Sequence, residues 1–219
     1  MVEVKICGLT RRGDAEEAVA AGAAYLGVIL APGGKRTISP ARAAEVTGGL
    51  GARRVGVFVN AGADEAMRAG QTAGLDVLQL HGAEVPETAA RLRDAGWTVW
   101  KAVHPRDAAE FERAVRTWDG AVDALLLDGW SPDAPGGTGA RFPWTEIAAV
   151  RDSLRGATRL VAAGGLRPEN VGRAVHLLRP HVVDVSSGVE SAPGVKDAAA
   201  IHAFVAAARS GPDPISEAG

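Results

Sequence analysis

The residues in this sequence that could do chemistry are a thiol and a carboxyl group, each placed at the end of a short apolar run. Cys7, the only cysteine, ends "VEVKIC", and Asp128 ends "VDALLLD". A thiolate can accept a proton and a carboxylic acid can donate one, so the pair suits acid–base chemistry. The ordinary alternatives are a buried, inert cysteine and an aspartate that caps a helix or turn. Sequence position alone leaves these alternatives open.

Each group needs help from its surroundings to play such a role. A free thiol has a pKa near ~8.5 and becomes a base only with nearby positive charge or a helix N-terminus. Lys5 precedes Cys7 by two residues, so in a strand both side chains point to the same side. We therefore expect Lys5 to favour the thiolate. Partial burial of Asp128 would favour the protonated form that a general acid needs.

Glycines and serines follow the last two apolar runs and suggest an anion site. "VAAGG" ends with Gly164 and Gly165, and "VDVSSG" ends with Ser186, Ser187 and Gly188. Backbone amides in such turns, with a short helix behind them, bind phosphate in many barrel proteins. Two ordinary tight turns would also explain the pattern, but its presence after both runs favours phosphate.

Five further residues are candidates for substrate binding. Arg36, in "GGKRTISP", could bind a carboxylate through two hydrogen bonds, although most loop arginines are only solvated. Gln79 and His81 end the run "LDVLQLH", and such a histidine is more often structural. Gly137 and Gly139 lie in "GWSPDAPGGTGARFPW", a segment long enough for a lid, where glycine lets the backbone approach a ligand.

Several classes of function are disfavoured. The five histidines show no metal-ligand spacing, so we expect no metal. No phosphate-binding Walker loop, no G-x-S-x-G motif and no basic–aromatic stripe occurs, and the net charge is −2, so we expect no nucleic-acid partner. No run approaches the ~18 apolar residues of a membrane span. One cysteine and a start without signal-peptide features favour a cytoplasmic protein.

The elements that must position these residues alternate along the chain. The apolar runs are nearly continuous, which is typical of strands covered on both faces. Helical spacing separates them, as in "SPARAAEVTGGL", where Ser39 is a suitable N-cap and Pro40 the first helical residue. Gly96 is placed to end the fourth helix. The predicted strands cover residues 2–8, 23–30, 53–59, 75–82, 97–103, 122–128, 158–165 and 181–188.

This alternation predicts a single (β/α)8 TIM barrel over residues 1–209, followed by a disordered C-terminal tail over residues 210–219. The rival is an open doubly wound sheet, but its first turn carries a G-x-G-x-x-G motif that "CGLTRRGD" lacks. In a barrel, chemistry takes place at the C-terminal ends of the strands and in the loops that follow. The candidate residues named above all fall there.

Taken together, "VKICGLT", "LDVLQLHG", "GGTGARFPW", "AAGGLRPENV" and "VDVSSGVESAPGVKD" resemble the phosphoribosylanthranilate isomerase family of tryptophan biosynthesis. The resemblance covers nearly the whole chain. It implies conversion of N-(5′-phosphoribosyl)anthranilate to 1-(2-carboxyphenylamino)-1-deoxyribulose 5-phosphate by an Amadori rearrangement, without cofactor. By the family pattern, Cys7 is the general base, Asp128 is the general acid, Arg36 binds the anthranilate carboxylate, and amides around Gly165 and Gly188 hold the phosphate. Family members occur as monomers and homodimers.

Two alternatives remain. A related phosphosugar isomerase of histidine biosynthesis would share the fold, but such enzymes carry aspartate where this chain has Cys7. A barrel that binds a phosphorylated ligand without catalysis is the non-enzyme alternative, and the presence of both Cys7 and Asp128 argues against it.

Overall fold

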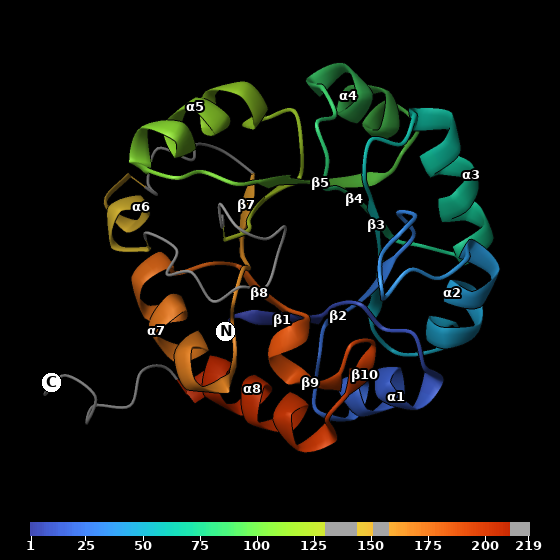
Figure 1. Cartoon of the computed structure of the whole chain (residues 1–219). Helices are drawn as coiled ribbons and strands as arrows, with labels where there is room; N and C mark the ends of the chain where they lie inside the picture. Colours follow the sequence, from blue (N-terminus) through green and yellow to red (C-terminus); the bar gives the residue numbers. More distant parts are fainter. Residues whose placement is uncertain (130–143, 151–157, 211–219) are drawn as a thin grey trace, which may run out of the picture.

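Eight parallel strands pair in chain order, and the eighth pairs with the first to close a barrel (Figure 1). The computed structural model describes residues 1–129, 144–150 and 158–210. The prediction of a (β/α)8 barrel is therefore confirmed. The strands are β1 (Glu3–Ile6), β2 (Tyr25–Ile29), β3 (Arg53–Phe58), β4 (Val77–Leu80), β5 (Thr98–Val103), β6 (Ala124–Leu127), β7 (Arg159–Ala162) and β8 (Val182–Val185).

Helices form a ring outside the strands (Figure 1). The cap predicted for the second helix is present, because the Ser39 side chain accepts a hydrogen bond from the Arg42 backbone at 3.2 Å and Pro40 is the first helical residue. Gly96 lies just past the fourth helix with φ +88°, as its predicted role requires. The helices are α1 (Arg12–Ala20), α2 (Pro40–Thr47), α3 (Ala63–Ala73), α4 (Pro86–Asp94), α5 (Ala108–Trp118), α6 (Trp144–Val150), α7 (Pro168–Leu178) and α8 (Ala198–Ser210).

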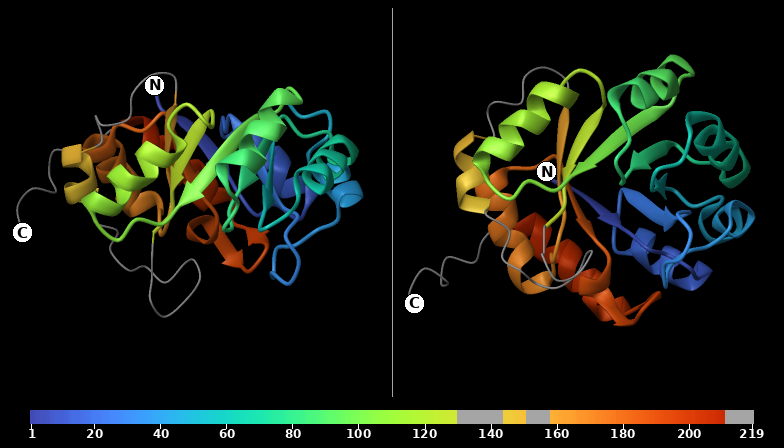
Figure 2. Two further views of the ribbon diagram at one scale, coloured as in Figure 1. Left: turned by 90° about the horizontal axis from the view of Figure 1, so that it is seen from above. Right: turned by 45° about the horizontal axis from the view of Figure 1, so that its top comes forward.

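A small hairpin follows β8 and was not predicted from the sequence. A 3₁₀ turn (η2, Ser187–Val189) leads into two short antiparallel strands, β9 (Glu190–Ala192) and β10 (Val195–Lys196). Figure 2 shows this hairpin at the opposite end of the barrel from the N-terminus. It therefore lies beside the C-terminal ends of the barrel strands, where the site was expected.

Strand alternation determines which side chains face the interior of the barrel. In β6, Ala124 and Leu126 belong to the apolar cluster inside the barrel, while Leu125 and Leu127 pack against the helices. Because side chains alternate with period two, Asp128 continues the inward row and points toward the barrel mouth.

The same alternation applies to β1, where Val4 and Ile6 face the helices. Lys5 and Cys7 therefore belong to the inward row, as the sequence predicted. In β4, Val77 lies in the interior cluster, so Gln79 and His81 follow it on the inward side.

The domain boundaries remain a prediction. Helix α8 ends at Ser210, one residue beyond the predicted barrel, and residues 211–219 of the predicted tail lie outside the described residues. Within the described part of the chain, none of the helices has the length and hydrophobicity needed to span a bilayer.

Candidate active site

A cavity of about 410 Å³ opens at the C-terminal ends of the barrel strands. It brings together every predicted site residue that the structure describes. Gly137 and Gly139 lie outside the described residues, so their predicted role in a lid is not tested. The predicted residues that line the cavity are Cys7, Arg36, Gln79, His81, Asp128, Gly164, Gly165, Ser186, Ser187 and Gly188.

Cys7 directly follows β1 and is held there by its backbone, which donates to the Val185 carbonyl at 2.8 Å. Its side chain needs space that Gly27 on β2 provides, because a Cβ atom on Gly27 would lie 2.8 Å from the Cys7 sulfur. Sequence reasoning missed Gly27, which looks like an ordinary glycine within a strand. The thiol is thus buried but lines the cavity.

Burial controls the ionisation of this thiol. Loss of solvent raises the pKa of Cys7 above its ordinary value, even though the Lys5 ammonium lowers it. The Lys5 Nζ donates to Asp184 Oδ2 at 2.8 Å, and Asp184 in turn raises the Cys7 pKa. Lys5 therefore lowers the Cys7 pKa, as predicted, but burial raises it by more. The resting side chain is a thiol.

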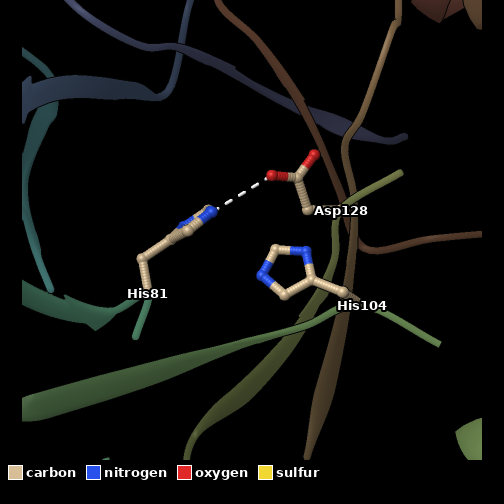
Figure 3. Close-up of side chains that lie close together, drawn as sticks. All are labelled: His81, His104 and Asp128. Atoms are coloured by element: carbon tan, nitrogen blue, oxygen red, sulfur yellow. Dashed lines mark hydrogen bonds and ion pairs between the residues drawn. The ribbon is translucent and has the colours of Figure 1, made fainter. Parts of the chain in front are cut away.

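Asp128 directly follows β6, and its carboxylate meets the imidazole of His81. The His81 Nε2 atom lies 3.1 Å from Asp128 Oδ2 (Figure 3). The other ring nitrogen, Nδ1, lies 2.9 Å from the amide nitrogen of Gln79. Gln79 and His81 were predicted to bind substrate. In the structure both line the cavity, the Gln79 amide nitrogen contacts His81, and His81 contacts Asp128.

His104, just past β5, completes a cluster that was not predicted. Its ring packs edge-on to His81 with centroids 5.3 Å apart (Figure 3). His81, His104 and Asp128 each present one potential ligand atom, all within 4.8 Å of one another, so by spacing alone they could hold a metal ion. Burial lowers the pKa of His104, and the nearby Lys101 ammonium lowers it further. The direct His81–Asp128 contact suits proton chemistry.

The loops after β6, β7 and β8 are in backbone contact with one another at glycine residues. A Cβ atom on Gly164 would lie 1.9 Å from the Gly129 nitrogen, and one on Gly188 would lie 2.0 Å from the Leu166 carbonyl oxygen. Only glycine permits such contact between two backbones. The predicted anion site is therefore a compact rim of glycine-containing loops.

Arg36 reaches the cavity from the loop after β2, and its guanidinium is held by Glu190 on β9. Nε and Nη2 donate to the two carboxylate oxygens at 2.8 and 2.6 Å. The two Nη1 hydrogens are not part of this fork and, within the described part of the chain, make no hydrogen bond, so a ligand can accept from them. The Arg36 stem crosses Gly8, where φ is +73° and a Cβ atom would lie 2.6 Å from Arg36 Cδ.

The Glu190 carboxylate that holds Arg36 also accepts a hydrogen bond from Lys196 on β10. The Lys196 ammonium donates to Glu190 at 2.8 Å and to the Ser186 carbonyl at 3.0 Å. Burial alone would raise the pKa of Glu190, but the two cations together lower it, so this carboxylate is charged. Arg36 and the loop after β8 are thereby joined by one network, which sequence reasoning missed.

The fold and this cavity define a (β/α)8-barrel enzyme, with a thiol, a carboxyl group, a guanidinium group and glycine-containing loops around one mouth. The model of the N-(5′-phosphoribosyl)anthranilate (PRA) isomerase family matches residues 4–207. The chain belongs to this family.

Curated relatives and solved structures agree with the match. The N-(5′-phosphoribosyl)anthranilate isomerase of Chromohalobacter salexigens is 46% identical over 204 residues, covering 92% of both chains. That of Rubrobacter xylanophilus is 42% identical over 212 residues, covering 96% of this chain and all of the relative. The crystal structure of the Thermotoga maritima phosphoribosyl anthranilate isomerase superposes with a TM-score of 0.87 at 38% identity, covering 96% of this chain and 100% of that one.

Another solved phosphoribosyl anthranilate isomerase contains reduced 1-(o-carboxyphenylamino)-1-deoxyribulose 5-phosphate. It superposes with a TM-score of 0.84 at 37% identity, covering 96% of this chain and 100% of that chain. The ligand of that protein carries a carboxylate at one end and a phosphate at the other. The cavity described above presents a guanidinium group and glycine-containing loops.

Proposed function

We propose that the protein catalyses the isomerisation of N-(5′-phosphoribosyl)anthranilate to 1-(2-carboxyphenylamino)-1-deoxyribulose 5-phosphate, a step of tryptophan biosynthesis. The observation that carries the proposal is that Cys7 and Asp128, which are far apart in the sequence, line one cavity. Membership of the PRA isomerase family supports the same reaction.

In the first step Asp128 acts as the general acid. Its carboxyl proton passes to the ribose ring oxygen while the bond between that oxygen and C1′ breaks. The electron pair on the anthranilate nitrogen forms the C1′=N double bond of an iminium ion. The sugar is now an open chain, and Asp128 is a carboxylate.

In the second step Cys7 acts as the general base. The thiolate takes the proton from C2′, the C–H electrons form a C1′=C2′ double bond, and the iminium electrons return to nitrogen. The resulting enolamine becomes the ketone when C1′ gains a proton and the C2′ hydroxyl loses one. The iminium is itself the electron sink, so the scheme uses no cofactor. Because burial raises the Cys7 pKa, only a minor fraction of the free enzyme holds the thiolate at neutral pH.

The two ends of the substrate match two parts of the cavity. Arg36 presents its Nη1 donors to the anthranilate carboxylate while Glu190 holds the other edge of the guanidinium. The loops around Gly164, Gly165 and Gly188, with Ser186 and Ser187, receive the phosphate.

The setting of the reaction follows from the chemistry. A thiol that must stay reduced to act as a base suits the cytoplasm. A crystal structure of a related enzyme is of monomers generated from the dimeric Thermotoga maritima isomerase. We accordingly propose that this chain acts as a monomer or homodimer on a small phosphorylated substrate, and light scattering after size-exclusion chromatography would measure its state.

The test is the loss of substrate fluorescence on addition of purified protein. We expect turnover by the wild type and a fall of ~10²–10⁴-fold in Asp128→Asn and in Cys7→Ser. Unchanged circular dichroism and thermal midpoint would show that both variants fold. Turnover of the histidine-pathway aminoaldose instead would favour the related isomerase, and binding of either compound without turnover would favour the non-catalytic barrel.

A further inference from the structure

Three side chains form a continuous hydrogen-bonded line that ends at the carboxyl group of Asp128. Gln79 lies inside the barrel with 1% of its surface exposed. Its amide contacts His81 Nδ1 at 2.9 Å, and His81 Nε2 contacts Asp128 Oδ2 at 3.1 Å. Figure 3 shows the His81 ring directed edge-on at the carboxylate. Both ring nitrogens of His81 are therefore engaged by protein atoms.

A general acid must hold a proton when the substrate arrives. A carboxyl group with the ordinary pKa of ~3.9 is protonated in only about one molecule in a thousand at pH 7. An imidazole has an ordinary pKa of ~6.5, and a neighbouring carboxylate helps it to keep its proton near neutrality. A carboxyl–imidazole pair can therefore retain near pH 7 a proton that a lone carboxyl group would have lost.

We propose that His81 is a positioning residue that stores the proton delivered by Asp128, and that Gln79 hydrogen-bonds Nδ1 of the imidazole in both its neutral and its protonated form. The inference rests on the proposed function, in which Asp128 is the acid. In the loaded state one proton lies on Nδ1 and another is shared between Nε2 and Oδ2. When Asp128 gives the shared proton to the ring oxygen, the pair becomes a carboxylate and a neutral imidazole. One proton from solvent restores the loaded state.

The Gln79 amide can serve both states. In the structure its nitrogen faces Nδ1, which fits a neutral imidazole with its proton on Nε2. The Gln79 Oε1 atom is buried and has no hydrogen-bond partner among the described residues. A half-turn of the amide would place that oxygen opposite Nδ1, where it accepts the Nδ1–H of the loaded imidazole.

Other charged groups around the pair come from four neighbouring elements. His104 follows β5. Burial lowers its pKa although the Asp128 carboxylate raises it, and the net lowering favours a neutral ring beside His81. The Lys101 ammonium on β5 is paired with Glu84 at 2.9 Å. On the far side of the cavity Cys7 follows β1, and Lys5 on β1 is paired with Asp184 on β8. With both ammonium groups paired, His81 is the titratable side chain in direct contact with the Asp128 carboxylate among the described residues.

The experiment compares the pH dependence of kcat/KM in the wild type, His81→Gln, Gln79→Glu and Gln79→Met. Glutamine at position 81 keeps an N–H near the Nε2 position but cannot take a second proton. We expect one apparent midpoint of its profile to fall by more than about one pH unit, and maximal kcat/KM to fall at least ~10-fold. Gln79→Glu accepts from Nδ1–H permanently, so the same midpoint should rise. Gln79→Met has a similar volume but cannot accept from Nδ1–H in this way, so it should lower activity without raising the midpoint.

The pH midpoint of kcat/KM should fall in His81→Gln and rise in Gln79→Glu. A purely structural role for these residues would not move the midpoint in opposite directions. His202→Gln, an exposed histidine on α8, is the matched control and should leave the profile unchanged. Midpoints that stay within about 0.3 pH units of the wild type in both His81→Gln and Gln79→Glu, in proteins with normal circular dichroism, would overturn the proposal.

NMR titration of the His81 ring separates this proposal from the proposed function, because it needs no turnover. We expect Asp128→Asn to move the midpoint of the His81 resonance to lower pH, and a midpoint that does not move would contradict the storage role. A wild type that does not isomerise the substrate would refute the proposed function while this titration still reported on the pair.

Discussion

Lys5 and Asp184 face each other across the seam that closes the barrel, and their side chains form an ion pair that interacts with the Cys7 thiol. They are register partners in the pairing of β1 with β8, and Lys5 Nζ lies 2.8 Å from Asp184 Oδ2. Both side chains are buried. The contact joins the first and last strands and also sets the electrostatic surroundings of Cys7.

Removing one member of this pair should destabilise the fold. Lys5→Met leaves the Asp184 carboxylate buried without its cation, and we expect a loss of about 3–5 kcal/mol in the free energy of unfolding, measured with urea. The double variant Lys5→Met/Asp184→Asn should recover most of the loss. Equal stability of the single and double variants would contradict the paired role.

The ion pair also predicts a dependence of stability on pH. Burial is the largest single influence on Lys5 and lowers its pKa, but the charge and hydrogen bond of Asp184, together with the interaction with Cys7, outweigh burial and leave the pKa raised. The stabilisation is therefore fully present below the ordinary lysine pKa of ~10.4 and is lost as the pH rises through the higher folded value. The stability that the Lys5 ammonium gives the wild type over the double variant should decline above about pH 10.

The thiol of Cys7 should react as a poor nucleophile at neutral pH. Because burial raises its pKa and the thiolate is the reactive form, alkylation by iodoacetamide should be slower at pH 7 than that of a free thiol. The midpoint of the rate against pH should lie above ~8.5. In Lys5→Met/Asp184→Asn it should move higher, since Lys5 lowers the Cys7 pKa more than Asp184 raises it. A midpoint below 8 would show that positive charge dominates burial.

The fork between Arg36 and Glu190 should govern substrate affinity more than turnover. Arg36→Lys loses the bidentate geometry, and we expect KM to rise at least ~10-fold with a smaller change in kcat. Glu190→Gln keeps the shape but loses the charge that holds Arg36 and Lys196, and should raise KM by a smaller factor. Arg42→Lys, an exposed arginine on α2, is the control. A fall in kcat alone in Arg36→Lys would contradict a binding role.

The sequence was sufficient to predict where the reactive side chains lie. The strand ends at Cys7 and Asp128 follow from continuous apolar runs, and period-two alternation places both side chains inward. Ser39 and Gly96 marked helix boundaries that the structure confirms. These features depend on neighbours within a few residues, which a sequence displays directly.

Features that depend on distant partners could not be predicted. Glu190 is 154 residues from Arg36, and nothing local distinguishes it from a solvated glutamate. The effect of Lys5 on Cys7 was overestimated because the closed barrel buries the thiol, and this burial raises the Cys7 pKa more than Lys5 lowers it. Gly27 is required only because another strand brings the Cys7 sulfur beside it.

Close backbone contact between the loops after β7 and β8 leads to a prediction about phosphate binding. In Gly188→Ala the new Cβ atom would lie 2.0 Å from the Leu166 carbonyl oxygen, so the two loops must separate. We expect weaker binding of inorganic phosphate by calorimetry and a KM raised at least ~10-fold, with a stability loss of about 1–3 kcal/mol. Gly13→Ala on α1, where a Cβ atom meets nothing within 4 Å, is the matched control. Since the new methyl group would displace the backbone at this rim, unchanged phosphate affinity in the folded variant would mean that the anion is held elsewhere.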